Sequence, residues 1–441
     1  MKSLSACLLL FLIFPLASCV STKLGPPSAS VFVTLEDAPI SSVVGFTTTI
    51  SSIKLNGTGS SQTELLAPNA PSVDFARLIG LRAPLTLVSG IPIDTYSGVT
   101  ITLASTPAPV IATVDGSGNV TLTNGTLAQA TVTVPFPVPV TLAKDQLTGL
   151  RLELDIQKTL QFSNGQVTVN PAFFAKGIQN SDTDAQITEL TGAISGVAAA
   201  NKSFTMPGTI KVTQSTQFNG TNTVQTLQSG AIAAVEGKYD SDGSITATWV
   251  EVIAAGPSYE TGIVVATSGQ TVTMWVEESS SDLKSDVAKT KTYDLSQVAQ
   301  YDTCFIGAVT SSAVFSGSTV LVGQRIMVTG TATNSVLTPV EVSLRRQGVY
   351  GTLVPGSVNI TTAPNAGNFQ MPGSGLAGFP ASAPLVVTTG TNSTFFSISG
   401  GLPTLQSSIT AVPLIARGLI LKDPNSGNPA MWAGWVAAPN Q

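Results

Sequence analysis

Short runs of β-branched and aliphatic residues, separated by turn residues and without long helical patterns between them, constrain the fold of this chain most strongly. Such runs occur at Val31 to Leu35, Phe46 to Leu55, Val99 to Leu103 and Thr131 to Phe136. Only 10% of the residues are charged, so the Glu and Lys residues that long surface helices favour are scarce. We therefore predict an all-β protein with an N-terminal antiparallel β-sandwich followed by three tandem small OB-like β-barrels.

The length of 441 residues predicts several domains. The predicted segments are a lipoprotein signal peptide at 1–18, a tether at 19–29, the β-sandwich at 30–172, and β-barrels at 186–255, 258–346 and 347–441.

The N-terminus has the pattern of a secretory signal peptide. Lys2 provides a positive charge, and the apolar stretch from Leu8 to Phe14 is too short to span a bilayer permanently. The stretch Leu16-Ala17-Ser18-Cys19 resembles the lipobox of bacterial lipoproteins, which implies that Cys19 carries lipid. Val20 follows it in place of the Asp that retains many lipoproteins at the inner membrane, which favours the outer membrane or the cell surface. The alternative is a secreted protein whose cysteine is coincidental.

The cysteine count predicts no intramolecular disulfide in the mature chain. Cys7 would leave with the signal peptide and Cys19 would carry lipid, so Cys304 would remain alone. Because Cys304 lies in a strand-like run, we interpret it as a small core residue.

The predicted sandwich resembles a known family. The early strand, the Leu35-Glu36-Asp37-Ala38-Pro39 turn, the Ile50 to Leu55 strand, the Val73-Asp74-Phe75 strap and Ile93-Asp94-Thr95-Tyr96 resemble domain-of-unknown-function family 4382 over residues 30–172. This family occurs in bacterial and archaeal envelope lipoproteins and has no established activity, so the resemblance implies a location and a fold. Glu36 stands where the family usually has Thr. Asn124-Gly125 further predicts a hairpin turn within this region.

The second half contains a repeated pattern. Gly192-Ala193-Ile194, Gly262-Ile263-Val264 and Gly351-Thr352-Leu353 each begin a unit, a Thr-x-Phe and a Leu-led strand follow, and a valine-bearing strand closes it. Five short bent strands per unit predict a small OB-like barrel. The first unit resembles domain-of-unknown-function family 5666, and the second does so more loosely because Glu277 to Lys291 inserts a charged loop.

The complete absence of histidine excludes much common chemistry. It removes the usual general base, the Ser-His-Asp and Cys-His arrangements and imidazole metal ligation. Glu153 and Asp155 alternate on one predicted strand at a spacing that two catalytic carboxylates could use, but Arg151 shares their face and a solvated strand surface explains all three. Ser281-Asp282-Leu283-Lys284 fits the Ser-x-x-Lys signature without its partner motifs, and we do not predict a catalytic residue.

No metal or other cofactor is expected. Asp240-Ser241-Asp242-Gly243 and Asp182-Thr183-Asp184 provide oxygen ligands, but neither completes a calcium loop, and we interpret both as turns.

Four tryptophans are the candidate ligand-binding residues. Trp249, Trp275, Trp432 and Trp435 could stack on sugar rings if they are exposed, and burial in a barrel wall is the alternative. A net charge of -5 disfavours nucleic acid as a partner. The sequence therefore predicts a non-catalytic cell-envelope lipoprotein with a binding or scaffolding role, bound to the membrane through the Cys19 lipid, with a glycan or an envelope protein as possible partner. The alternatives are a carboxylate-dependent polysaccharide hydrolase and a purely structural spacer.

Overall fold

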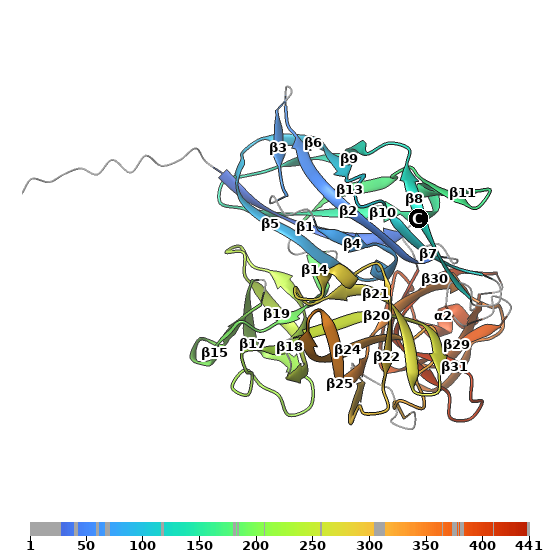
Figure 1. Ribbon diagram of the computed structural model, residues 1–441. Helices are drawn as coiled ribbons and strands as arrows, with labels where there is room; N and C mark the ends of the chain where they lie inside the picture. The colour runs from blue at the N-terminus through green and yellow to red at the C-terminus, as the bar shows by residue number, and fades with distance from the viewer. Residues whose placement is uncertain are drawn as a thin grey trace, which may run out of the picture.

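Strands form nearly all of the regular secondary structure in the computed structural model (Figure 1), which confirms the all-β prediction. The structure describes residues 28–38, 43–58, 61–66, 71–115, 119–179, 182, 185–206, 208–255, 258–303, 314–363, 365–372, 377, 379, 383–408 and 410–438. The predicted signal peptide, the predicted lipidation site Cys19 and Cys304, which the sequence predicted as a core residue, lie outside the described residues. No described helix is long and apolar enough to cross a membrane.

Two sheets form the N-terminal sandwich. The first has four strands in the order β13 (Phe173–Ile178), β10 (Leu147–Asp155), β1 (Ser28–Ala38) and β5 (Ala83–Pro92). Strand β1 begins at Ser28, so the last two residues of the predicted tether belong to the sheet. The β1 and β10 strands run parallel, so the sandwich is mixed and not purely antiparallel as predicted.

The second sheet has nine strands. Its main path runs β11 (Leu160–Ser163), β12 (Gln166–Val169), β8 (Val120–Leu127), β7 (Val110–Val114), β2 (Val43–Asn56), β6 (Thr95–Leu103) and β9 (Thr131–Thr141). Strands β3 (Gln62–Glu64) and β4 (Ser72–Asp74) also pair with β2. Alternating residues from both sheets, such as Val31, Val33, Ile50 and Ile53, form one shared core.

The predicted hairpin turn at Asn124-Gly125 is wrong. Both residues lie inside β8, which pairs with β7 and β12. A Cβ atom at Gly125 would lie 2.6 Å from the Val169 side chain, so this glycine allows close packing instead of a turn.

Three further sheets follow, each with six strands, and none of the sheets closes into a barrel. The third sheet runs β14 (Gln186–Ala193), β18 (Ala231–Tyr239), β19 (Ile245–Ala255), β17 (Thr209–Phe218), β16 (Ser203–Thr205) and β15 (Gly196–Ala198). The fourth runs β22 (Thr290–Asp294), β21 (Thr271–Ser279), β20 (Ser258–Ser268), β24 (Arg325–Thr333), β25 (Val336–Leu344) and β23 (Gln300–Thr303). The fifth runs β26 (Gln347–Thr352), β30 (Pro413–Lys422), β31 (Pro429–Ala437), β29 (Pro384–Phe396), β28 (Ala366–Pro372) and β27 (Asn359–Ala363).

The third, fourth and fifth sheets share a pairing pattern. When the six strands of each sheet are counted in their order along the chain, the first strand pairs with the fifth and the fifth pairs with the sixth. The sixth strand also pairs with the fourth, in parallel. In the third sheet the first two strands occupy opposite edges although only Ile194 and Ser195 separate them along the chain. The Ile194 N–H donates to Ala231 beside β14, and the Ser195 N–H donates to Thr205 beside β15.

Short helical segments are few in the described residues. They are the helices α1 (Ile156–Thr159) and α2 (Leu402–Gln406) and the 3-10 helices η1 (Ala76–Leu78), η3 (Ala199–Asn201) and η4 (Lys284–Asp286). The segment Val73-Asp74-Phe75, which the sequence predicted as a strap, is divided: Val73 and Asp74 lie in β4, and η1 follows from Ala76.

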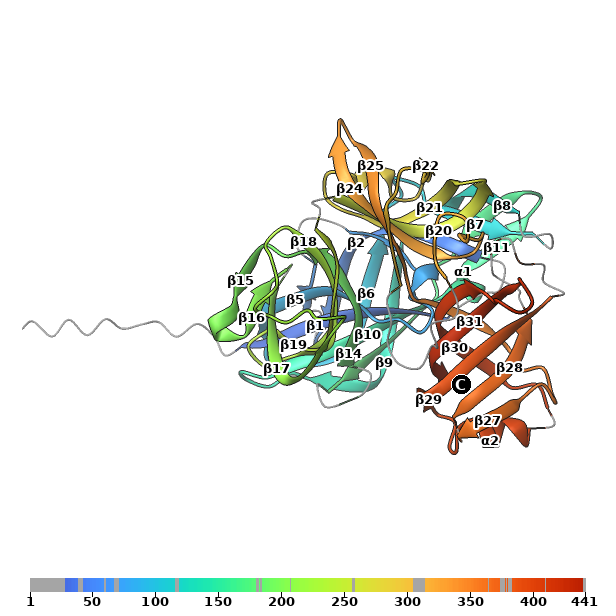
Figure 2. The same cartoon turned by 90° about the horizontal axis from the view of Figure 1, so that it is seen from below.

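The sandwich lies on one side of the three smaller sheets. Figure 1 shows it above the green, yellow and orange-red sheets, and Figure 2, from below, shows those three arranged around a common centre. The Phe32 ring extends from the sandwich and lies 4.9 Å from the Tyr239 ring of the third sheet. The core of the fourth sheet includes Leu419 and Leu421 from the fifth, so the units share buried surfaces.

Candidate functional site

A strap at the edge of the sandwich contacts each of the three smaller sheets. The strap comprises η1 and the turn that follows it, Ala76 to Arg82. Its Arg77 pairs with Glu278 of the fourth sheet at 2.5 Å. Backbone groups of Arg82 exchange hydrogen bonds with Thr188 of the third sheet at 2.7 and 3.0 Å.

The strap also touches the fifth sheet, and glycines make this approach possible. A Cβ atom at Gly348 of β26 would lie 2.0 Å from the Ile79 carbonyl oxygen. At Gly80, whose φ is +64°, a Cβ atom would lie 3.2 Å from the Trp435 ring. Because both backbones come so close, only glycine fits at position 348 without movement of the strap.

Asp74, directly before the strap, is buried against the fourth sheet. Its carboxylate accepts hydrogen bonds from the Trp275 indole Nε1 at 2.9 Å, the Phe46 N–H at 2.9 Å and the Ala76 N–H at 3.1 Å. Burial raises the pKa of Asp74, although these hydrogen bonds oppose the effect. The three donors satisfy a carboxylate that would otherwise be costly to bury.

Trp275 is therefore not a ligand-stacking residue, which corrects the prediction. Its side chain is completely buried, its N–H is bonded to Asp74, and its ring packs on the Gly45 backbone, where a Cβ atom would lie 2.4 Å from Nε1. The indole fills the joint between the sandwich and the fourth sheet, so neither of its faces is open to a sugar ring.

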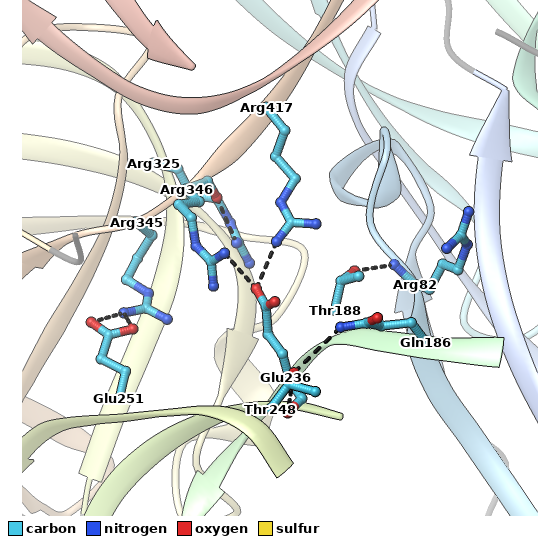
Figure 3. Close-up of polar contacts among 10 residues, drawn as sticks. All are labelled: Arg82, Gln186, Thr188, Glu236, Thr248, Glu251, Arg325, Arg345, Arg346 and Arg417. Atoms are coloured by element: carbon cyan, nitrogen blue, oxygen red, sulfur yellow. Dashed lines mark hydrogen bonds and ion pairs between the residues drawn. The ribbon is translucent and has the colours of Figure 1, made fainter. Parts of the chain in front are cut away.

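The centre of the assembly holds a cluster of ion pairs that we call the arginine hub: Glu236, Glu251, Glu277, Arg325, Arg345, Arg346 and Arg417. Figure 3 shows these residues except Glu277. Glu236 of β18 pairs with Arg346, which follows β25, and with Arg417 of β30 at 2.6 Å. Burial raises the pKa of Glu236, but the two guanidinium groups lower it further, and the net result is a pKa below the usual value. This carboxylate thus joins the third, fourth and fifth sheets.

Two further pairs in the hub are almost fully buried. Arg345 Nη1 lies 2.7 and 2.8 Å from the two Glu251 carboxylate oxygens, which joins the fourth sheet to the third. Arg325 Nε donates to Glu277 Oε2 at 2.7 Å within the fourth sheet. Burial raises the pKa of Glu277 to about 7, against the opposing effect of Arg325. Removing one partner from such a pair would leave a buried charge without compensation.

The hub borders a small recess that is partly open to solvent and has a cavity volume of about 10 Å³. Its wall includes Leu81 of the strap, Thr188, Glu236 and the guanidinium groups of Arg345 and Arg346. In this wall Arg346 is ion-paired with Glu236, and Arg345 is ion-paired with Glu251 of the third sheet. Among the described residues, no group of three or more Cys, Asp or Glu side chains could hold a metal ion.

Glu153 and Asp155, the carboxylates weighed for hydrolysis, are both committed to local structure. Glu153 Oε2 pairs with Arg151 Nη2 at 2.5 Å, and Arg151 also pairs with Glu36 at 2.7 Å. Asp155 caps α1 by accepting from the Lys158 N–H at 3.0 Å. The two groups therefore stabilise the edge of the sandwich.

The other motifs from the sequence form turns and loops. Asp240 and Asp242 lie in the turn between β18 and β19, where both accept hydrogen bonds from Lys211 Nζ, at 3.0 and 2.8 Å. Ser281 and Lys284 are exposed in the loop between β21 and β22. The Asp282 carboxylate between them accepts hydrogen bonds from Ser258 and Ser280 at 2.6 and 2.5 Å.

The remaining three tryptophans are half-buried and lie on two different sheets. Trp249 is in β19, and its Nε1 is buried without a partner among the described residues. Trp432 packs against the core of the fourth sheet, and the Trp435 ring lies 5.6 Å from the Phe396 ring. Ligand binding by Trp249, Trp432 and Trp435 stays a prediction.

The arginine hub was not predicted from the sequence. The available signal was the adjacent pair Arg345-Arg346 directly after the strand that closes the second repeat unit, in a chain with few charges. Its carboxylate partners, Glu236 and Glu251, lie 110 and 94 residues away, and no local pattern connects them.

Comparison with known proteins identifies one domain. Residues 191–251 match the family model of a domain of unknown function, DUF5666, which covers most of the third sheet. No curated protein matches this chain. A solved structure titled drosophila Unr CSD456 is similar at 9% identity, over 57% of this chain and 98% of its own, with a TM-score of 0.14 that does not establish a shared fold. The resemblance of residues 30–172 to family 4382 stays a prediction.

Proposed function

We propose that this protein is a non-catalytic cell-envelope lipoprotein that acts as a rigid scaffold or binding platform at a membrane surface. The observation that carries this proposal is the arginine hub. Its ion pairs connect the third sheet to the fourth and to the fifth. The Gln324 side chain adds a 2.8 Å hydrogen bond from the fourth sheet to the fifth at Ile420.

The strap completes this network, because it joins the sandwich to all three smaller sheets through Arg77, Arg82 and the backbone at Ile79. Contacts that cross every domain boundary favour one rigid body over a flexible string of domains. A rigid body of this kind can hold a binding surface at a fixed place relative to its anchor. The described carboxylates at the domain boundaries are bonded to arginines or indole groups, which supports a structural role for them.

The anchor in this proposal is lipid on Cys19, in the outer membrane or at the cell surface. The lipobox-like Leu16-Ala17-Ser18-Cys19 supports it, and each buried methylene of an acyl chain contributes about 0.8 kcal/mol to membrane binding. The partner would be a glycan or another envelope component, since net charge of -5 makes nucleic acid unfavourable.

We further propose that the last three sheets are tandem OB-like units of one repeat. The strand pairing that the three sheets share supports this proposal. A second observation also supports it: β14 and β15 lie at opposite edges of the third sheet but are consecutive along the chain. In this interpretation β14 and β15 are two halves of one bent strand in a sheet that remains open, so the likeness to an OB fold lies in the strand order and not in closure. The sandwich would be a family 4382 domain.

The first test is lipidation and membrane retention in a bacterial host. We expect the wild-type chain to incorporate a fatty-acid probe and to sediment with the membrane fraction, whereas Cys19→Ser should lose both properties. Cys304→Ser is the matched control and should keep both. A wild-type chain without the probe, or equal sedimentation of Cys19→Ser, would contradict the anchor.

The scaffold role is tested separately with the anchored protein. Cross-linking in intact cells, followed by purification, should recover an envelope glycan or protein with the wild-type chain. The same partner should be lost from an Arg345→Met variant that remains anchored, because the domains would no longer hold their relative positions. Turnover of an envelope polysaccharide by the purified protein would contradict the non-catalytic assignment.

A further inference from the structure

Three side chains with complementary chemistry meet at one end of the fourth sheet. Glu260 lies in β20, Asp286 ends η4 and Lys291 lies in β22. The Lys291 amine Nζ lies 2.8 Å from Asp286 Oδ2, and the Asp286 carboxyl group is close enough to the Glu260 carboxyl group for each to shift the pKa of the other. An amine, the carboxyl group that it contacts and a second carboxyl group therefore form a continuous chain.

Glu260 is placed inside the sheet's core. It pairs with Val328 of β24, whose side chain belongs to that core, and it is completely buried. Among the described residues, no N–H or O–H group donates a hydrogen bond to either Glu260 carboxyl oxygen. The Asp286 carboxyl group is its neighbouring acid. A buried carboxyl group without a cation of its own is expensive for a fold to maintain, which indicates a role beyond stability.

The two carboxyl groups are held in different protonation states. Burial raises the pKa of Glu260 to about 8, and the neighbouring Asp286 adds to the effect. Burial also raises the pKa of Asp286, but the hydrogen bonds from Lys291 and Glu260 lower it below its usual value. At neutral pH Glu260 is thus an acid beside the Asp286 carboxylate, as proton transfer between them requires.

We propose that Lys291 and Asp286 are joined by an isopeptide bond that forms within the folded chain, with Glu260 as its general acid and base. The site is independent of the proposed scaffold function, since it lies within one sheet. It assigns a covalent modification to a loop that the sequence marked as a charged insertion.

The proton balance closes without another reactant. Glu260 gives its proton to Asp286, which makes that carboxyl group neutral and electrophilic, and it takes one proton from the Lys291 ammonium group. The Nζ lone pair then forms the N–C bond to Asp286 Cγ. Glu260 relays a second nitrogen proton to one Asp286 oxygen, the C–O bond breaks, and water leaves. Glu260 ends protonated as it began, and fixed proximity replaces activation by an external enzyme.

A second lysine–aspartate pair in the chain is the matched control. Lys158 Nζ lies 2.7 Å from Asp155 Oδ2, as close as the first pair, but the Lys158 side chain is 76% exposed. In water the ammonium form of lysine is strongly favoured. We therefore expect no bond between Lys158 and Asp155.

Peptide mapping of the purified full chain tests the proposal. Trypsin cuts after Lys289, between the two partners, so the bond would join the peptide Ser285–Lys289 to the peptide that begins at Thr290. We expect one branched species that lacks the mass of one water, and no free amine at Lys291 after reductive methylation. Separate peptides, a methylated Lys291, or a water loss confined to the Asp286 peptide would overturn the proposal.

Two variants define the mechanism. Lys291→Arg keeps the positive charge but cannot form the amide, so its intact mass should correspond to no water loss. Glu260→Gln keeps the side chain's size but cannot relay protons, and at least tenfold less branched peptide is expected from a folded sample. Lys158→Arg should leave the branched peptide unchanged. Full branching in Glu260→Gln would exclude Glu260 as the acid–base group.

Discussion

Single buried carboxyl groups distinguish this protein at the residue scale. Asp37, Glu260 and Glu341 are almost completely buried, and none is bonded to a cation among the described residues. Burial raises the pKa of Glu341 to about 7, with a further contribution from Asp302, and raises the pKa of Asp37 well above its usual value. These residues link the stability of the fold to pH.

The sign of this linkage follows from the direction of the shifts. A carboxyl group whose pKa is higher in the folded state than in the unfolded state binds its proton more tightly in the folded protein. Its contribution to the free energy of unfolding is therefore complete below the pKa of the unfolded state, and it is lost as the pH rises through the pKa of the folded state. We expect the free energy of unfolding in urea to be higher at pH 5 than at pH 8. The contribution of Glu341 is about 1 to 2 kcal/mol.

Variants at Glu341 and Asp423 separate this effect from general pH sensitivity. Glu341→Gln should stabilise the protein at pH 8 relative to wild type and reduce the difference between the two pH values. Asp423→Asn removes an exposed carboxylate whose pKa its hydrogen bonds from Asn425 and Ser426 lower, so its effect should be equal at pH 5 and pH 8. Equal pH dependence of wild type and Glu341→Gln would contradict the assignment.

Close approach between elements depends on a few glycines. Strand β2 meets β21 where the Trp275 ring lies on Gly45, and strand β26 meets the strap at Gly348. A side chain at either position would separate two elements that the hydrogen bonds and ion pairs around them hold together. The contact between the sandwich and the fourth sheet therefore depends on glycine at position 45, directly against the Trp275 ring.

Gly45→Ala is expected to destabilise the protein by about 1 to 3 kcal/mol, because an added methyl group overpacks the joint. Since Trp275 is the fully buried tryptophan, its fluorescence should shift to longer wavelength as water enters. Gly196→Ala in β15 is the control, because no described atom lies within 4 Å of the added Cβ and its effect should stay within about 0.5 kcal/mol. Equal effects of the two substitutions would contradict this account.

We expect the arginine hub to couple the unfolding of the sheets that it joins. The third, fourth and fifth sheets each have a hydrophobic core of their own. The ion pairs of the hub cross between these sheets, because the carboxylate partners of Arg345 and Arg417 both lie in the third sheet. Loss of one charge would leave its partner buried without compensation in a domain boundary. We therefore expect a single unfolding transition for the wild-type chain.

A double-mutant cycle measures this coupling. Arg345→Met alone should cost about 3 to 5 kcal/mol and should separate the calorimetric transition into two, whereas Arg345→Met with Glu251→Leu should recover most of the loss. Lys158→Met, which breaks an exposed pair, should leave the free energy of unfolding nearly unchanged. Additive effects at Arg345 and Glu251 would show that the pair does not join the domains.

The sequence alone determined that the chain is β and where many of its strands lie. Alternation of apolar and polar residues predicts β2 and β6, and Asp240 to Gly243 predicts the turn between β18 and β19, because these signals depend on neighbours along the chain. The all-β class is confirmed on that basis. The repeat pattern in the second half stays a proposal that the shared strand pairing supports.

The partners of the buried polar groups depend on the tertiary fold. Trp275 and Asp74 are 201 residues apart, and Arg345 and Glu251 are 94 residues apart, so no local pattern indicates that these groups meet. The same limit explains Asn124-Gly125, where close contact with Val169 overrides the local preference for a turn. The periodicity of apolar and polar residues determines whether a segment forms a strand, because it depends on neighbours along the chain. The free-energy cost of burying a charged group depends instead on the groups that lie across the domain boundary, which are far away in the sequence.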